Sequence, residues 1–95
     1  MFIISITYVK PLEEVDKHMD AHWAFLEKYY EADVFLIWGR KVPRVGGIII
    51  GQADSLKIMQ KIANEDPFVT EGVATVEVTE FNVSKAKPGI KELLR

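Results

Sequence analysis

The chain has 95 residues and no cysteine; 48% of its residues are hydrophobic, 27% are charged, and its formal net charge is −2. This composition is typical of one small soluble globular domain, and the lack of cysteine excludes disulfides, thiol catalysis and thiolate metal sites. A slightly negative chain has no electrostatic basis for binding nucleic acid, because that affinity depends on neutralising phosphates. The first residues lack the features of a signal peptide, and no apolar run approaches the ~20 residues of a membrane span. We therefore expect a cytoplasmic protein that does not enter membranes.

The first predicted elements are a strand and a helix. Residues 2–9, FIISITYV, alternate a bulky set of side chains with a second, partly polar set, which is the period of two that a strand requires. Pro11 suits the first turn of a helix, and Glu13 and Glu14 place negative charge at the positive end of the helix dipole. We predict that this helix runs to about Ala32.

Two strongly apolar segments follow and are separated by a loop. Residues 34–39, VFLIWG, and residues 45–52, VGGIIIGQ, are apolar at nearly every position, which is expected of strands buried on both faces. The loop between them contains Pro43 and leads into the Gly46-Gly47 pair. These turn-forming residues predict a β-hairpin.

The remaining elements are a second helix, a last strand and a tail. Asp54 or Ser55 can cap the helix, and Pro67 stops it. Residues 73–83, VATVEVTEFNV, predict the last strand. We expect a single domain with its core at about residues 2–83 and a C-terminal tail at 84–95 that forms a helical turn or two and contacts another subunit.

The predicted order β-α-β-β-α-β folds most simply as a ferredoxin-like α+β sandwich, a four-stranded antiparallel sheet with both helices on one face. Two helices cover only one face of a sheet whose middle strands are apolar on both. A second sheet from another copy is the expected cover, so the sequence predicts a homodimer.

A histidine lies at the centre of the apolar stripe of the first helix. Taking ~100° per residue, Val15, Met19, Phe25 and Leu26 all fall within about 80° of His22. A buried imidazole needs a partner for its N–H, because an unpaired polar group costs on the order of 1–3 kcal/mol. From the pattern alone, two readings stay open: a hydrogen-bonded core histidine, and a group with a chemical role.

His18 and His22 are four residues apart and could together bind a metal ion. The glutamate that completes the zinc-binding HExxH motif is absent, and no third ligand is positioned by the sequence. We therefore expect no metal, and we expect His18 at the edge of the stripe.

Several segments resemble the YciI-like (YCII-related) family of small proteins over about residues 2–82. They are AHWAFL in the first helix, FLIWG in the second strand, ADSLKIMQKIANEDPFVTEGV from the second helix into the last strand, and VEVTEF after it. The most specific feature combines the Asp-Pro-Phe turn and Gly72 with a histidine midway along the first helix. The resemblance implies the dimeric α/β barrel, which agrees with the fold predicted above.

The resemblance also implies a paired histidine and aspartate as the active site, which here are His22 and Asp66. One relative eliminates chloride from a chlorinated hydroxyaromatic compound without a cofactor, and the wider superfamily includes muconolactone isomerases and cofactor-free monooxygenases. Asp66 would accept one imidazole N–H while the other nitrogen moves a substrate proton. An aspartate before proline also commonly caps a turn through its own backbone, which is the alternative reading of Asp66. Many members have Gly-Pro where this chain has Gly39-Arg40, a change that can alter the substrate pocket. The identity of the substrate is therefore the part of the resemblance that is least transferable to this chain.

Other side chains are candidates for contact with a small-molecule ligand. Trp23, Trp38 and Phe68, with Tyr8 and Tyr29, can line an apolar pocket or belong to the core. Arg40 belongs to a basic hairpin loop with Lys41 and Arg44, which either closes over an anionic substrate or is solvated. We predict substrate contacts from Trp23, Trp38, Arg40 and Phe68.

Three functions agree with these residues. The first is a cofactor-independent lyase or isomerase that uses His22 and Asp66 on a small hydroxyaromatic compound, lactone or related acid. The second is a dimer that binds a small metabolite without converting it. The third is a structural oligomerisation domain, in which phenylalanine or leucine at position 22 is harmless.

Overall fold

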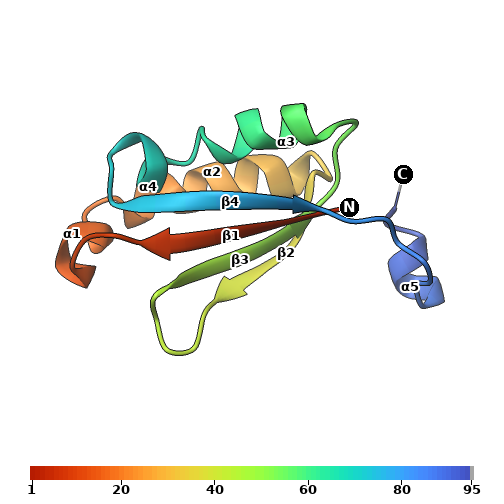
Figure 1. Ribbon diagram of the computed structural model, residues 1–95, viewed down its shortest axis with the longest axis horizontal. Helices are drawn as coiled ribbons and strands as arrows, with labels where there is room; N and C mark the ends of the chain where they lie inside the picture. The colour runs from red at the N-terminus through yellow and green to blue at the C-terminus, as the bar shows by residue number, and fades with distance from the viewer. Residues whose placement is uncertain (95) are drawn as a thin grey trace.

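The computed structural model describes residues 1–94, which form a four-stranded sheet in the order β2-β3-β1-β4 with every neighbouring pair antiparallel. The strands are β1 (Phe2–Tyr8), β2 (Phe35–Arg40), β3 (Gly46–Gly51) and β4 (Ala74–Glu80), and the helices are α1 (Leu12–Asp16), α2 (Met19–Glu31), α3 (Leu56–Ala63), α4 (Pro67–Thr70) and α5 (Pro88–Lys91). Figure 1 shows α2 and α3 on the same face of the sheet. The predicted ferredoxin-like α+β sandwich is confirmed.

The hydrophobic core lies between the sheet and these helices. The alternation of β1 directs its even-numbered side chains into this layer, and the interior of the fold consists of Phe2, Ile4, Ile6, Val15, Phe25, Leu26, Phe35, Ile49, Met59, Ala63, Phe68, Val73 and Ala74. His22 and Asp66 are buried among them, at 8% and 1% exposure. Two polar side chains thus lie inside an otherwise apolar layer and need partners there.

The opposite face of the sheet is divided between apolar and polar side chains. Ile3 of β1 pairs with Ile50 of β3, while Ser5 of β1 pairs with Glu77 of β4. On the edge strand β2, Ile37 pairs with Ile50 and is 60% exposed. Figure 1 shows no helix of residues 1–94 over this face. The β2–β3 half of the outer face therefore presents apolar surface, whereas the β4 half presents hydroxyl and carboxylate groups.

The predicted helix from Pro11 to Ala32 is wrong in one respect, because the structure breaks it into α1 and α2. The break lies at Lys17 and His18, where the His18 amide bonds to the Val15 carbonyl and His18 has φ −109° and ψ 10°. The segment contains neither proline nor glycine, and the apolar stripe passes through it without interruption. Periodicity reports which face is buried and is insensitive to such a turn.

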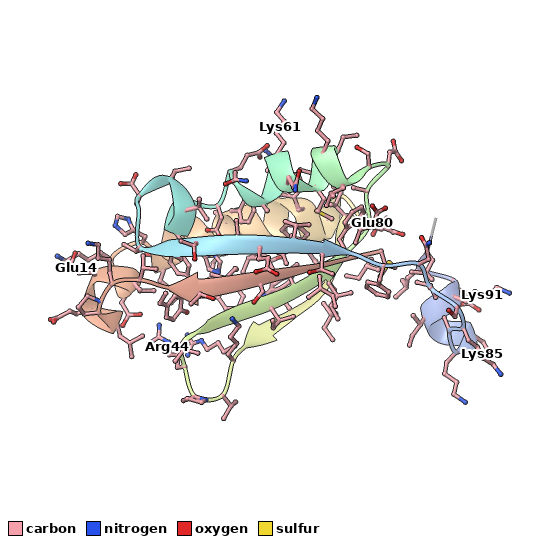
Figure 2. All side chains as sticks on the ribbon, viewed as in Figure 1. Glu14, Arg44, Lys61, Glu80, Lys85 and Lys91 are labelled. Atoms are coloured by element: carbon pink, nitrogen blue, oxygen red, sulfur yellow. The ribbon has the colours of Figure 1, made fainter. Side chains whose placement is uncertain are left out.

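The predicted strand 73–83 is also too long, since β4 ends at Glu80. Beyond it the Phe81 amide bonds to the Met1 carbonyl, and the tail leaves the sheet. Figure 2 shows Lys85 and Lys91 beyond the end of the sheet, around the single turn of α5. The buried Gln52 side chain donates to the Leu93 carbonyl at 2.9 Å and holds the returning end of the tail. The last predicted tail residue, 95, lies outside the described part, and contact with another subunit stays a prediction.

Candidate active site

His22 lies in the first half of α2, on the face that packs against the core. Phe25 and Leu26 are the other buried side chains of this helix, as its apolar stripe predicts. The imidazole Nδ1 lies 2.8 Å from Oδ1 of Asp66, forty-four positions along the chain. The side chains of both residues are almost wholly buried, at 11% and 2% exposure. The pairing that the family resemblance implied therefore exists as a direct hydrogen bond.

Asp66 is held at the corner between α3 and α4 by its local sequence. Pro67 disfavours helical geometry at the residue before it, and Asp66 accordingly has φ −56° and ψ 125°. Its Oδ1 accepts the backbone N–H of Phe68 at 2.9 Å and so caps the short helix α4. The two readings of Asp66 are thus both present, because one carboxylate oxygen caps the turn and also accepts the His22 ring.

The hydrogen bond assigns different roles to the two imidazole nitrogens of His22. An ionised carboxylate can only accept hydrogen bonds, so Nδ1 carries the proton that Oδ1 of Asp66 accepts. In the neutral ring Nε2 is then the basic nitrogen. The geometry thereby fixes the tautomer in which Nε2 can take a proton.

Phe68 holds the imidazole from one face. The two rings are stacked, with centroids 3.9 Å apart and planes inclined by only 9°. The segment from Asp66 to Phe68 therefore contacts His22 twice, through a carboxylate at the ring edge and through a phenyl ring on its face. The side chain of Phe68 also lines the cavity described next, although it is itself only 1% exposed.

A cavity of about 170 Å³ lies beside His22, between α2 and the sheet. All four residues predicted to contact a ligand line it, and its walls are made by Ile6, Tyr8, Met19, His22, Trp23, Leu26, Trp38, Gly39, Arg40, Gly46, Gly47, Ile48, Ile49 and Phe68. Trp23 and Trp38 meet edge to face with centroids 5.8 Å apart. An apolar cavity of ~150 Å³ can hold benzene, so this volume suits a molecule with one aromatic ring.

The end of β2 and the β2–β3 loop contribute three cations, and they have different surroundings. Arg44 bonds to Asp16 of α1 at 2.5 Å, and Lys41 bonds to the Thr7 hydroxyl at 3.3 Å. The Arg44 hydrogen bond holds the pKa of the Asp16 carboxyl below its ordinary value. Among residues 1–94, Arg40 takes part in no ion pair, and it lines the cavity. Arg40 is therefore the one of these three cations that lies on the cavity wall.

Tyr29, which the sequence also proposed for the pocket wall, does not line the cavity. Its ring packs edge to face against Phe25, and its hydroxyl donates to Glu65, the residue before Asp66. Burial, and then the hydrogen bond to Glu65, raise the pKa of Tyr29 to about 12. The side chain thus ties α2 to the corner that holds Asp66, one heptad away from His22.

We expect the stability contribution of Tyr29 to fall in alkali. An unfolded tyrosine ionises near pH 10, whereas the folded one holds its proton to about pH 12. The stabilisation is therefore complete below pH 10 and is lost as the pH rises toward 12. Between pH 9 and pH 11 the difference in unfolding free energy between wild type and Tyr29→Phe should narrow by on the order of 1 kcal/mol, discounted for partial exposure.

Urea unfolding followed by circular dichroism at the two pH values measures this difference. Tyr30→Phe is the matched control, because Tyr30 is half-exposed on the same helix. A Tyr29 difference that is constant with pH would contradict the assignment.

The sequence did not identify the contribution of backbone and small residues to the cavity. Gly47 pairs with Ile6 and lines the cavity, and a Cβ there would lie 3.1 Å from the Gly39 carbonyl oxygen. Met19 lines the same cavity from the first turn of α2. The Gly46-Gly47 pair is the sequence signal for this part of the wall, but by itself it predicts only a turn.

Within residues 1–94, no three histidine, aspartate or glutamate side chains gather where they could hold a metal ion. His18 is partly buried at the start of α2. The carboxylate of Asp66 bonds to His22 and not to His18. None of the helices in the described residues has the length and apolar character needed to cross a membrane.

Comparisons with known proteins agree with this fold. The model of the YCII-related domain family matches residues 1–82. A similar solved structure is 5-chloro-2-hydroxyhydroquinone dehydrochlorinase from Burkholderia phenoliruptrix AC1100, in complex with 2,5-dihydroxybenzoquinone, with a TM-score of 0.71 and 19% identity over 86% of this chain and 94% of that chain. At this identity the likeness shows the fold alone. No curated protein sequence matches the chain significantly.

Proposed function

Because this chain belongs to the YCII-related family, we propose that it is a cofactor-independent acid–base enzyme of the lyase or isomerase type, with His22 and Asp66 as its catalytic pair. The observation that carries the proposal is the hydrogen bond from Nδ1 of His22 to Oδ1 of Asp66, beside a cavity that His22 lines. A similar fold in a dehydrochlorinase supports a catalytic role.

The proposed chemistry begins with proton transfer to Nε2 of His22. Asp66 accepts the Nδ1–H bond throughout and stabilises the positive charge that the ring acquires. General acid–base catalysis of this kind contributes about 10²- to 10⁴-fold, which suits a substrate that is already acidic at carbon or oxygen. The protonated His22 then returns its proton to another atom of the substrate or to the leaving group.

The cavity walls support a small aromatic or ring-shaped acid as the substrate. Its volume of about 170 Å³ suits one ring, which Trp23 and Trp38 would contact with their indole faces and edges. Arg40 would bind an anionic oxygen of this ring. A hydroxyaromatic compound, a lactone or a related small acid has this combination of size, planarity and charge.

We further propose that two copies pack through the outer face of the sheet. Ile37 is 60% exposed there, and its neighbours across β3 and β1 are also isoleucines. Such an apolar surface on a small chain is best covered by a partner. A homodimer in the cytoplasm is the expected state, and light scattering of Ile37→Glu, which should be monomeric, tests the interface.

The reactivity of His22 toward diethyl pyrocarbonate tests the acid–base proposal without knowledge of the substrate. The chain has only two histidines, so His18→Gln leaves His22 as the sole imidazole. We expect Nε2 to be modified in this variant, and we expect 2,5-dihydroxybenzoquinone to slow the modification by filling the cavity. Absorbance of the modified ring gives the rate, and His18→Gln/His22→Gln gives the background.

Three outcomes separate the candidate functions. Protection by a ring compound that is also chemically converted supports the enzyme, and conversion should vanish in His22→Gln. Protection without conversion of any bound compound indicates a binding protein. An unreactive His22, together with unchanged stability of His22→Leu, would instead indicate a structural domain.

A further inference from the structure

Tyr8 is a second polar group on the wall of the same cavity. It is the last residue of β1, and its half-buried ring meets Phe68 edge to face, with centroids 5.8 Å apart and planes at 86°. Phe68 is also the ring that stacks on His22. Tyr8 and His22 therefore contact one shared phenyl ring and line one cavity, which brings two groups that can move or donate protons to the same small space.

The surroundings of Tyr8 differ from those of a tyrosine that only packs. The guanidinium carbon of Arg44 lies 5.9 Å from the centre of the Tyr8 ring. Arg44 bonds to the Asp16 carboxylate at 2.5 Å, and this hydrogen bond raises the pKa of Arg44 above its ordinary value. Figure 2 shows Arg44 at the end of the sheet where α1 lies. Asp16 thus holds a cation in place beside the phenol.

The two pairs have complementary electrostatics. His22 is backed by the carboxylate of Asp66, which favours positive charge on the imidazole. The guanidinium of Arg44 lies over the Tyr8 ring, and its positive charge would stabilise negative charge that develops nearby on a bound substrate. When a base removes a proton from a substrate, positive charge appears on the base and negative charge on a substrate oxygen. The pair of His22 and Asp66 suits the positive charge on the base, and the pair of Tyr8 and Arg44 suits the negative charge on the substrate oxygen.

We propose that Tyr8 donates its hydroxyl hydrogen bond to the substrate oxygen on which negative charge develops, and that Arg44 is a positioning residue that strengthens this donor. The inference rests on the proposed function. His22 Nε2 takes the proton, and the electron pair of the broken bond moves onto the oxygen that Tyr8 contacts. The phenolic proton stays on Tyr8. The charge is discharged when His22 returns its proton to another substrate atom or when a leaving group departs with the electron pair.

Arg40 has a different role from Tyr8 in this arrangement. It is exposed and belongs to the end of β2 next to the loop, so it meets a ligand beside bulk water. Tyr8 is half-buried against Phe68, where a hydrogen bond to charge is stronger because less water competes. Arg40 therefore serves ligand capture, while Tyr8 serves the reacting oxygen.

Two aromatic probes of the same size separate an oxyanion contact from packing. 4-Nitrophenol carries an anionic oxygen when the pH is high enough to ionise it, whereas nitrobenzene carries none. Their affinities for wild type and Tyr8→Phe can be measured by calorimetry, with Tyr30→Phe as the control because Tyr30 is half-exposed and contacts Trp38 instead. We expect Tyr8→Phe to bind 4-nitrophenolate about 10- to 100-fold more weakly, since hydrogen bonds to charged groups are the strong ones. Its affinity for nitrobenzene should stay within about twofold of wild type, because the phenyl ring is retained.

Arg44→Gln tests whether Arg44 acts through Tyr8. We expect it to weaken 4-nitrophenolate binding in wild type and to have little further effect in the Tyr8→Phe background, which is the non-additivity of residues that act together. Equal weakening of both probes in Tyr8→Phe, or no weakening of either, would overturn the role of Tyr8.

Protection of His22 separates this inference from the proposed function. If 4-nitrophenol protects His22 from diethyl pyrocarbonate while Tyr8→Phe binds it with wild-type affinity, the Tyr8 role fails and the acid–base proposal stands. If wild type binds neither probe and no ring compound protects His22, both fail.

Discussion

Replacing Asp66 with alanine is expected to lower the free energy of unfolding by about 2–4 kcal/mol. The substitution removes the hydrogen bond from the Phe68 amide that caps α4, worth ~1 kcal/mol, and it leaves the His22 Nδ1–H without its acceptor in the core, at about 1–3 kcal/mol for a buried unpaired donor. Urea unfolding of the two proteins at neutral pH measures the loss. The effect is large because Asp66 is 1% exposed, so water cannot replace the carboxylate without opening the fold.

Asp66→Asn is the matched control and should separate stability from chemistry. The amide oxygen of asparagine can accept both hydrogen bonds that Oδ1 accepts now, so the unfolding free energy should fall by less than about 1 kcal/mol. A neutral amide cannot stabilise the imidazolium, and turnover of any converted substrate should fall by about 10²- to 10⁴-fold. If Asn and Ala variants lose stability equally, the shared acceptor is not the source of the effect.

Gly46→Ala is expected to destabilise the protein by about 3 kcal/mol or more, at the upper end of the cost of overpacking. A Cβ at this position would lie 1.8 Å from the carbonyl oxygen of Ile6 and 2.7 Å from its carbon. Both are backbone atoms of β1 and cannot turn away as a side chain would. The methyl group must push β3 from β1 where Gly46 pairs with Thr7, next to the cavity. Thermal and urea unfolding measure the loss, and binding of 2,5-dihydroxybenzoquinone should be lost with it.

Gly39→Ala is the control for this prediction. Gly39 lies on the edge strand β2, and a Cβ there would meet nothing within 4 Å. Its stability should stay within about 0.5 kcal/mol of wild type, as for surface substitutions in general. An equal loss in both variants would indicate a general penalty for replacing glycine in this sheet rather than the clash at position 46.

Local patterns were sufficient to predict the architecture. Alternation in residues 2–9 and the apolar runs of β2 and β3 identified the strands, and the stripe around His22 identified the buried face of α2. The break at His18 could not be predicted this way, because no helix-breaking residue marks it and the buried face is the same on both sides. The prediction that Pro67 stops the second helix is wrong, because α3 ends at Ala63 and Pro67 is the first residue of the single turn α4, which was not predicted.

The sequence could propose residues for the candidate site but not the distances between them. The family resemblance named His22 and Asp66, but periodicity could not say whether the corner before Pro67 reaches α2. That depends on how α2 and α4 pack, which is a tertiary property. The stacking of Phe68 and the pairing of Arg44 with Asp16 were not predictable for the same reason, because each joins segments that are far apart in the chain.

Oδ1 of Asp66 accepts two hydrogen bonds, so the geometry of the candidate site forms only when the whole chain folds. Its two donors come from the adjacent turn and from a helix forty-four residues earlier, so neither bond can be set correctly until the long-range packing is complete. A partly folded chain should therefore hold a histidine with an unassigned tautomer and no competent base. The exchange of the Phe68 amide with deuterated solvent would report this directly, because this amide proton is released only when the Asp66 carboxylate leaves its place.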